Sequence, residues 1–317
     1  MKILVTEPRL YKDEFLDVLK NHEVFIENIL EKNISSMKDN VEILLIGLDT
    51  KLDEKTLRHF PSLKYIVTPT TGIDHIDENF CKQKNIKIVS LKGETDFLQN
   101  ITATAEHTFG LILSLTRNIP AAFYSVRNYK WDRDKFVGTD LNGKTLGILG
   151  FGRYGKIMTR YAKAFNMDVI AYDPLTIEKE NMKKQGVDYQ SWDKIFQNSD
   201  IVSVHINYSE KTHGLIGRKE FEMMKKNAFF INTSRGKIIV EEDLLNALES
   251  KKIGGAAVDV LSTENQKNHP RVNPLVNYSK NHDNLIITPH IGGSTHESME
   301  ETVKFVLKKL LNNLKEG

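Results

Sequence analysis

Three segments in the second half of the chain each place a polar side chain within or just after an apolar run. Arg235 follows the first run, and its guanidinium can bind a carboxylate with two parallel hydrogen bonds. Asp259 interrupts a run whose pattern predicts burial, where acids are rare unless they are paired or functional. His290, between a proline and a Gly-Gly turn, is a candidate general acid. Taken singly, a surface arginine and a structural histidine remain the alternatives.

A glycine-rich run separates a predicted strand, 145–149, from a predicted helix, 156–165. This order of strand, turn and helix places a dinucleotide pyrophosphate at the helix N-terminus. Gly150 allows the tight turn, Gly152 lets the backbone approach the phosphates, and Gly155 lets the helix pack close to the strand. Glycine turns are common, so the pattern alone is weak evidence and its neighbours must support it.

Asp173 supplies that support, because it ends the next predicted strand, 168–172, and lies 18 residues after Gly155. This is close to the spacing of the acid that binds a ribose 2′-hydroxyl. A carboxylate there repels a 2′-phosphate, and the next two residues, Pro174 and Leu175, are not basic. The sequence therefore favours NAD over NADP. The alternative is a solvated turn residue beside a proline.

The elements that must position these residues follow an alternating pattern of short apolar strands and helices. The first hundred residues predict strands at Lys2–Val5, Val24–Ile26, Ile43–Ile46, Tyr65–Val67 and Ile86–Val89, and helices at 12–21 and 55–60. From residue 145 onward, strands are predicted near 145–149, 168–172, 201–205, 228–232, 254–258 and 285–288. Six strands with intervening helices match a complete dinucleotide-binding sheet.

Two helices complete the predicted architecture. A long helix covers 101–116, with Pro120 just beyond its end, and the last helix, 298–314, crosses back to the first unit. We therefore expect an α/β protein with two Rossmann-like domains, parallel sheets and helices on both faces. Residues 1–100 plus 291–317 form a substrate domain, and 101–290 form an NAD-binding domain. An active site is expected in the cleft between them.

Composition excludes several other classes of protein. The net charge of the 317 residues is +2 with acids and bases interspersed, so no nucleic acid is expected as a partner. Cys81 is the only cysteine, which rules out a disulfide framework within the chain and fits a reducing compartment. No signal peptide and no run of about 18 apolar residues is present, so no membrane partner is expected. We expect a soluble cytoplasmic protein without a metal site.

Together the motifs resemble those of the D-isomer-specific 2-hydroxyacid dehydrogenases, over about Pro61 to Met299. The segments that carry the resemblance are Leu141–Gly147, Gly150–Gly155, Asn232–Gly236, Asp259–Val260 and Thr288–Thr295. In that family the coenzyme domain is inserted into the substrate domain, in agreement with the mid-chain glycine motif. The C-terminal signature is most similar to phosphoglycerate dehydrogenases. Because the chain ends at Gly317, no C-terminal regulatory domain is expected.

The resemblance implies roles for individual residues. Arg235 matches the arginine that binds the substrate carboxylate and carbonyl, His290 the proton donor and acceptor, and Glu264 the acid that hydrogen-bonds this histidine. A carboxylate partner stabilises imidazolium, so His290 can carry a proton near neutral pH. The remaining matches are to cofactor and substrate contacts: Thr233, Ser234 and Asp259 for the nicotinamide side, Arg153 and Tyr154 for the pyrophosphate, and Thr71 and Gly72 for the substrate carboxylate.

The sequence departs from the family mainly on the substrate side. The 91–98 loop is longer than usual, Asn265 replaces a common proline, 266–283 looks extended, and Asn207 also stands where many members have proline. Gly47 and Leu48 occupy the place where phosphoglycerate dehydrogenases carry a basic residue. A small unphosphorylated 2-hydroxy or 2-oxo acid is thus at least as good a candidate as 3-phosphoglycerate.

Three readings of the function compete. The first is an NAD-dependent D-2-hydroxyacid dehydrogenase. The second is another hydride enzyme such as formate dehydrogenase, which predicts glutamine in place of Glu264. The third is a non-catalytic NAD-sensing protein similar to the family's corepressors. The resemblance also implies a homodimer, formed through 101–116 and the arm that follows.

Overall fold

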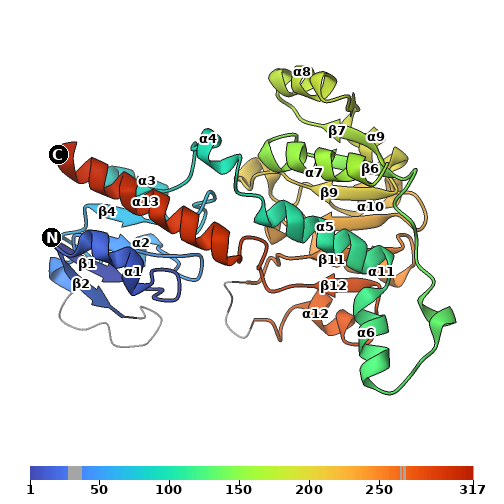
Figure 1. Cartoon of the computed structure of the whole chain (residues 1–317), viewed down its shortest axis with the longest axis horizontal. Coiled ribbons are helices and arrows are strands. Elements are labelled where there is room, and N and C mark those ends of the chain that lie inside the picture. The colour runs from blue at the N-terminus through green and yellow to red at the C-terminus, as the bar shows by residue number, and fades with distance from the viewer. Residues whose placement is uncertain (28–37, 265, 267–268, 317) are drawn as a thin grey trace. The chain divides into compact units, whose positions relative to one another are not determined.

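The computed structural model describes residues 1–27, 38–264, 266 and 269–316 (Figure 1). The chain divides into two compact units, 1–101 with 294–317 and 102–293. The second unit thus continues past His290 to Gly293. The reason is local, because the amides of Ile291 and Gly292 donate hydrogen bonds to Asp259 and so bind these residues to the second unit.

The first unit is built on a parallel five-stranded sheet in the order β2-β1-β3-β4-β5. The strands are β1 (Lys2–Val5), β2 (Glu23–Ile26), β3 (Ile43–Leu45), β4 (Tyr65–Val67) and β5 (Lys87–Val89). Successive apolar residues face opposite sides: Ile43 and Leu45 join one buried cluster and Leu44 the other. The sheet is therefore covered on both faces, as parallel sheets usually are.

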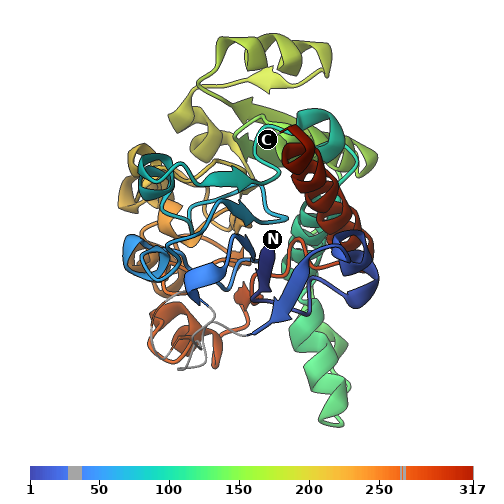
Figure 2. The ribbon, with the colours of Figure 1, turned by 90° about the vertical axis from the view of Figure 1, so that its left-hand side faces the viewer.

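Short helices connect these strands, and the long C-terminal helix returns to the same unit. They are α1 (Asp13–Leu16), α2 (Glu54–Leu57), α3 (Glu78–Gln83), α4 (Thr95–Leu98) and α13 (His296–Glu316). Short 3₁₀ turns occur at Asp17–Leu19 and Lys38–Asn40. Val303, Val306, Leu307 and Leu310 of α13 are buried against the sheet, on the face that α1 also covers (Figure 2). The expected return of the last helix to the first hundred residues is confirmed.

The second unit contains a parallel seven-stranded sheet in the order β12-β11-β10-β9-β6-β7-β8. Its strands are β6 (Thr145–Leu149), β7 (Asp168–Tyr172), β8 (Asp188–Tyr189), β9 (Ile201–Val204), β10 (Phe229–Asn232), β11 (Gly255–Val258) and β12 (Leu285–Ile287). The order reverses between β6 and β9, which is the crevice where dinucleotides bind in such sheets. Phe230 and Ile231 belong to the buried clusters of opposite faces, so both faces are packed.

Eight helices of the second unit are described. They are α5 (Ala103–Thr116), α6 (Ile119–Arg127), α7 (Arg153–Ala164), α8 (Thr176–Lys184), α9 (Trp192–Asn198), α10 (Arg218–Met223), α11 (Glu241–Glu249) and α12 (Pro274–Ser279). Short 3₁₀ turns occur at Arg133–Phe136, Glu210–Thr212 and Gly236–Ile238. Helix α5 packs with α7 and over β10, β11 and β12 (Figure 1).

Two elements of the second unit differ from the sequence-based prediction. The sheet has seven strands rather than six, because β8 has only two residues, Asp188 and Tyr189, and no apolar run marks it. The sequence-based prediction also contains no helix at α6, although α5 ends at Thr116 as predicted, and Pro120 lies in the first turn of α6. Proline has no backbone N–H, but the N–H groups of the first helical turn have no acceptor within the helix. Proline therefore fits at the start of a helix as well as after its end.

Candidate active site

The late polar residues follow three neighbouring strands of the second sheet. β10 pairs with β11 and β11 with β12, all in parallel, so their carboxyl ends meet at one edge. Arg235 comes three residues after β10, Glu264 six after β11, and His290 three after β12. The tertiary structure thus gathers residues that are far apart in the sequence at the edge where open α/β sheets bind ligands.

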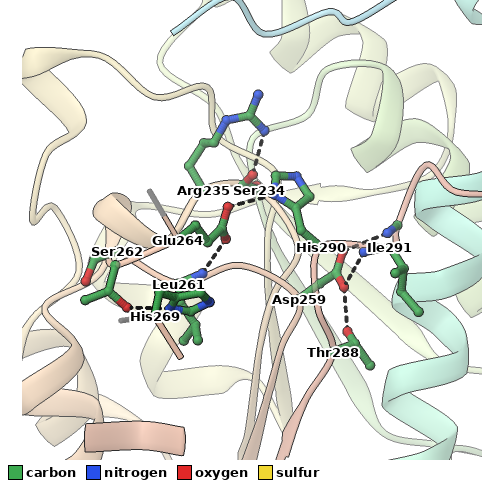
Figure 3. Close-up of polar contacts among 12 residues, drawn as sticks. Ser234, Arg235, Asp259, Leu261, Ser262, Glu264, His269, Thr288, His290 and Ile291 are labelled. Atoms are coloured by element: carbon green, nitrogen blue, oxygen red, sulfur yellow. Dashed lines mark hydrogen bonds and ion pairs between the residues drawn. The ribbon is translucent and has the colours of Figure 1, made fainter. Parts of the chain in front are cut away.

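His290 and Glu264 are in direct contact (Figure 3). Nδ1 of His290 lies 2.8 Å from Oε2 of Glu264, and each side chain is about a quarter exposed. The other carboxylate oxygen of Glu264 accepts a hydrogen bond from the Leu261 amide at 2.6 Å. An ionised carboxylate only accepts, so the ring donates from Nδ1 and Nε2 is left facing away from Glu264.

The backbone of His290 has a left-handed conformation with φ of 54°. This conformation costs a non-glycine residue about 1–2 kcal/mol, so the surrounding structure must hold it. The His290 amide donates to the carbonyl oxygens of Asp259 and Thr288, at 2.9 and 3.0 Å. Strained backbone held in this way is typical of functional sites, where it fixes a side chain in one orientation.

Asp259 is the buried acid predicted from the β11 pattern, and its side chain is only 1% exposed. Its carboxylate accepts hydrogen bonds from Thr288 Oγ1 at 2.5 Å and from the amides of Ile291 and Gly292 at 2.9 and 2.8 Å. His107 Nε2 lies 3.2 Å away. Burial alone would raise the pKa of Asp259, but these hydrogen bonds outweigh it and hold the pKa below its ordinary value.

Arg235 is anchored by its backbone beside the segment that carries Glu264. Its carbonyl oxygen accepts a hydrogen bond from Asn232 Nδ2 at 3.1 Å, and its Nη1 donates to the Ser234 carbonyl at 2.9 Å. A Cβ on the next residue, Gly236, would lie 2.1 Å from the carbonyl carbon of Leu261. Glycine is therefore required there, because the two backbones touch and fix Arg235 relative to the turn that ends at Glu264.

The glycine turn has the geometry of a dinucleotide site. Gly150 has φ of 94°, and a Cβ there would meet the His205 carbonyl oxygen at 2.6 Å. At Gly155 a Cβ would lie 2.4 Å from the Gly150 carbonyl oxygen, so the helix packs directly on the turn. Gly152 differs, since no described atom lies within 4 Å of the same position. It is also the N-cap of α7 and has no side chain to cover the first-turn amides, Arg153 and Tyr154 included, so a phosphate fits there.

Asp173 lies at the end of β7 beside this turn. It is 8% exposed, which excludes the alternative of a solvated residue. Oδ2 accepts a hydrogen bond from the Phe151 amide at 2.9 Å and Oδ1 from the Leu175 amide at 2.9 Å. Each carboxylate oxygen retains a lone pair for a further donor such as a ribose hydroxyl.

The hydroxyl groups of Thr233 and Ser234, by contrast, are engaged within the protein. Thr233 Oγ1 lies 2.8 Å from Thr108 Oγ1, and Ser234 Oγ donates to the Val204 carbonyl at 2.7 Å. Both residues follow β10 and so remain at the same strand edge as Arg235. Tyr154 Oη contacts Thr104 Oγ1 at 3.0 Å, which joins α7 to the start of α5.

Thr71 and Gly72 lie in the first unit, in the loop after β4. The Thr70 hydroxyl donates to the Gly72 carbonyl at 2.8 Å and lies 3.0 Å from the Thr68 hydroxyl. Thr71 is exposed.

Within the described chain, no helix is long and apolar enough to cross a membrane. Asn265, which replaces a proline common in the resembled family, lies outside the described residues.

Comparison with known proteins identifies the family. The model of the D-isomer specific 2-hydroxyacid dehydrogenase NAD binding domain matches residues 109–292. D-3-phosphoglycerate dehydrogenase of Archaeoglobus fulgidus is 33% identical over 318 residues, covering 99% of this chain and 58% of that protein. Hydroxypyruvate reductase of Thermotoga maritima is 32% identical over 292 residues, covering 92% of this chain and 91% of that protein. The chain belongs to the D-isomer-specific 2-hydroxyacid dehydrogenase family.

A solved structure supports the same family. D-lactate dehydrogenase from Aquifex aeolicus, complexed with NAD and lactic acid, matches with a TM-score of 0.84 and 28% identity, covering 100% of this chain and 96% of that one. The predictions of two Rossmann-like domains and of NAD as cofactor are confirmed. The chain spans 52–58% of the length of three phosphoglycerate dehydrogenases that it matches.

Sequence reasoning missed two residues of this site, His107 and Thr288. Both contact Asp259, and their side chains contact each other at 3.0 Å although they are 181 residues apart. Thr288 stands inside a recognised motif but was given no role. His107 lies within α5, whose many buried residues gave no signal that one polar side chain faces a carboxylate at a strand end.

Proposed function

We propose that this chain is an NAD-dependent D-2-hydroxyacid dehydrogenase. It catalyses reversible hydride transfer between NAD(H) and C2 of a small 2-hydroxy or 2-oxo acid. The observation that carries the proposal is the 2.8 Å contact between Glu264 Oε2 and His290 Nδ1, at the same strand edge as Arg235. A histidine oriented by a carboxylate is a general acid–base device, and an arginine beside it binds the carboxylate of the substrate.

In the direction of reduction, Arg235 binds the carboxylate of the 2-oxo acid with two parallel hydrogen bonds. Bound NADH supplies the hydride that reaches C2. His290 donates the proton on Nε2 to the carbonyl oxygen as the hydroxyl forms. Glu264 keeps the ring in one tautomer by accepting the hydrogen on Nδ1. In the reverse direction His290 accepts the hydroxyl proton at the same nitrogen.

The residues of the second unit divide into two groups under this proposal. The turn of Gly150, Gly152 and Gly155 receives the pyrophosphate with the backbone amides of Arg153 and Tyr154, and Asp173 binds the ribose. Thr233, Ser234 and Asp259 line the nicotinamide side. In the first unit, Thr71 and Gly72 bind the substrate carboxylate, so residues 1–101 with 294–317 act as the substrate domain.

The substrate proposed first is a small, unphosphorylated 2-oxo acid. The position of Gly47 supports this choice, because glycine supplies no positive charge for a phosphate and a Cβ there would meet the carboxylate of Glu7. D-3-phosphoglycerate remains the second candidate, because several relatives carry that name.

A panel of 2-oxo acids tests the proposal directly. Purified protein is given NADH with hydroxypyruvate, glyoxylate, pyruvate or 3-phosphohydroxypyruvate, and loss of NADH absorbance is followed. We expect turnover with at least one acid and a higher kcat/KM for an unphosphorylated one. Tight NADH binding with no turnover across the panel contradicts the enzyme proposal and favours an NAD-sensing protein.

We further propose that the chain forms a homodimer through α6 and the segment after it. This region, 119–137, exposes an unusual number of large apolar side chains, including Phe123, Tyr124, Tyr129 and Trp131. Soluble monomers rarely leave such a patch uncovered. A second copy of the chain is the proposed cover, in line with the family resemblance.

A further inference from the structure

His107 is the outermost member of a hydrogen-bonded chain that ends at the strained turn of His290. Its Nε2 lies 3.0 Å from Thr288 Oγ1 and 3.2 Å from Asp259 Oδ1. The Thr288 hydroxyl is 2.5 Å from the same Asp259 oxygen, which as a carboxylate can only accept. The threonine proton therefore points to Asp259, and its lone pair accepts from His107. This order requires the hydrogen of His107 to be on Nε2.

Asp259 in turn binds the backbone at His290 and at the two residues that follow it. Its two oxygens accept from the amides of Ile291 and Gly292, while its carbonyl accepts from the His290 amide. Three successive amides are thus bound by one residue. The left-handed backbone at His290 needs such support, because this conformation is unfavourable for a residue with a Cβ.

Helix α5 is in direct contact with this turn. A Cβ at Gly292 would lie 3.0 Å from Asp259 Oδ2 and 3.2 Å from Thr104 Cγ2, one turn before His107. The Thr288–Gly292 turn is therefore packed between the Asp259 carboxylate and α5. His107 is the side chain of α5 that donates to Thr288 and Asp259. The His107 side chain is 20% exposed, whereas that of Asp259 is buried.

We propose that His107 is a positioning residue for His290. By donating to Thr288 and Asp259 it keeps the Thr288–Gly292 turn in the one arrangement that directs the His290 ring to Glu264 and the substrate. The inference rests on the proposed role of His290, and it adds a residue on α5 to the machinery of proton transfer. His107 itself contacts neither substrate nor the reacting atoms in this assignment.

Two substitutions at position 107 distinguish the role of the hydrogen-bond donor from that of the side-chain volume. His107→Phe fills the space but removes the donor, whereas His107→Gln keeps an N–H near the place of Nε2. His282→Phe is the matched control, because His282 is an exposed histidine of the same unit, stacked on Tyr278. Measured quantities are kcat and KM on the best acid of the panel, the NADH dissociation constant, and the solvent deuterium isotope effect on kcat.

For His107→Phe we expect kcat to fall about tenfold, the size of one lost hydrogen bond to a buried charge, with little change in NADH affinity. The isotope effect should rise, since a loosely held His290 makes proton transfer slower. His107→Gln should recover most of the loss, and His282→Phe should match the parent protein. Unchanged kcat and isotope effect in His107→Phe, or equal losses in His107→Phe and His107→Gln, overturn the proposal.

A readout without turnover distinguishes this inference from the proposed function. In protein labelled with ¹⁵N-histidine, the ring signals of His290 are assigned by their loss in His290→Gln. His107→Phe should shift those signals, and His282→Phe should leave them in place. If no acid is turned over but the shift occurs, the proposed reaction fails while the positioning of His290 stands. Unmoved His290 signals in His107→Phe contradict the positioning role whatever the activity.

Discussion

At the scale of single residues, two acids make different contacts around His290, the proposed general acid. Glu264 is partly exposed and bonds the ring of His290 directly. Asp259 is buried and bonds the backbone around that histidine. One acid therefore orients the imidazole and the other holds the peptide that carries it. Under the proposed mechanism both contacts matter, because a general acid must be within about 3 Å of the atom that it protonates.

Replacing His290 removes the proposed proton donor. His290→Ala should lower kcat by about two to four orders of magnitude, the range found for loss of a general acid or base. NADH affinity should stay nearly constant, because the glycine turn and Asp173 are untouched. Steady-state kinetics and NADH fluorescence titration measure the two effects. Activity equal to that of the parent protein would remove His290 from the mechanism.

Asp173 is expected to set the choice between the two nicotinamide cofactors. Asp173→Ala removes the carboxylate that bonds a ribose hydroxyl and repels a 2′-phosphate. The NADH-over-NADPH ratio of kcat/KM should therefore narrow by about tenfold, the size of one charge-assisted hydrogen bond. Asp188→Ala, an exposed acid on the neighbouring strand β8, is the control. An unaltered ratio in Asp173→Ala argues against its ribose role.

At the scale of elements, close backbone approaches hold the site together. The turn after β10 lies against the turn after β11 at Gly236, and the glycine turn after β6 lies against the end of β9 at Gly150. Parallel strands bring their ends to one edge, but the loops that follow must still pack. Glycine at these two positions lets the backbones touch, so the loops are fixed by contact rather than by side chains.

Gly236→Ala tests this packing. Its Cβ would lie 2.1 Å from the Leu261 carbonyl carbon and 2.3 Å from the Ser262 nitrogen, so the backbones must separate. Overpacking of this kind costs about 1–3 kcal/mol of unfolding free energy. Arg235 and Glu264 would also move apart, so kcat should fall. Urea unfolding and kinetics measure both, with Gly110→Ala in open space on α5 as the control. Equal losses in the two variants contradict the argument.

His205, at the end of β9, should make stability depend on pH. Burial lowers the pKa of His205 from 6.5 to about 4. The unfolded chain therefore takes up a proton below about pH 6.5 while the folded chain does not. Unfolding free energy should fall as pH drops from about 6.5 to 4, by up to about 3 kcal/mol. Urea unfolding across this range measures the slope, and His205→Gln should flatten it. A parent protein with no such slope contradicts the prediction.

At the scale of the whole molecule, the chain forms two sheets of different size, and crosses between its units twice. The crossings lie at 101/102 and 293/294, so the second unit is inserted into the first. The first crossing immediately precedes α5, and the second follows the turn that Asp259 binds. In the second unit, the helix that carries His107 thus follows the first crossing, and the second crossing comes after Gly292, which binds Asp259.

The exposed apolar residues of 119–137 belong to this scale, because they concern the proposed assembly of two chains. Phe123 and Trp131 are 64% and 87% exposed in the single chain. The double variant Phe123→Asp with Trp131→Glu should convert a dimer to a monomer, since charges are poorly tolerated in the core of an interface. Val18→Asp, at an exposed apolar residue of the first unit, is the control. Sedimentation velocity measures the mass, and a double variant that remains dimeric moves the interface elsewhere.

Much of the architecture could be predicted because it depends on local patterns. The strands of both sheets follow from short apolar runs, and the glycine turn from its place between a strand and a helix. The prediction missed the two-residue strand β8, which no apolar run marks, and helix α6, which has no buried residues and so no core-facing pattern. Helix ends also differ from the predicted ones by a few residues, because tertiary contacts as well as local pattern set them.

The sequence by itself determined the residue types of the site and the strands that they follow. Arg235, Asp259, Glu264 and His290 each stand near the end of a predicted strand, and spacing alone placed Asp173 near the glycine turn. Only the tertiary structure decided which of them meet. The Glu264–His290 contact, the left-handed turn at His290 and the approach of His107 to Asp259 depend on strand order and on how α5 packs. Local pattern encodes secondary structure, whereas contacts between distant residues form only when the sheet assembles.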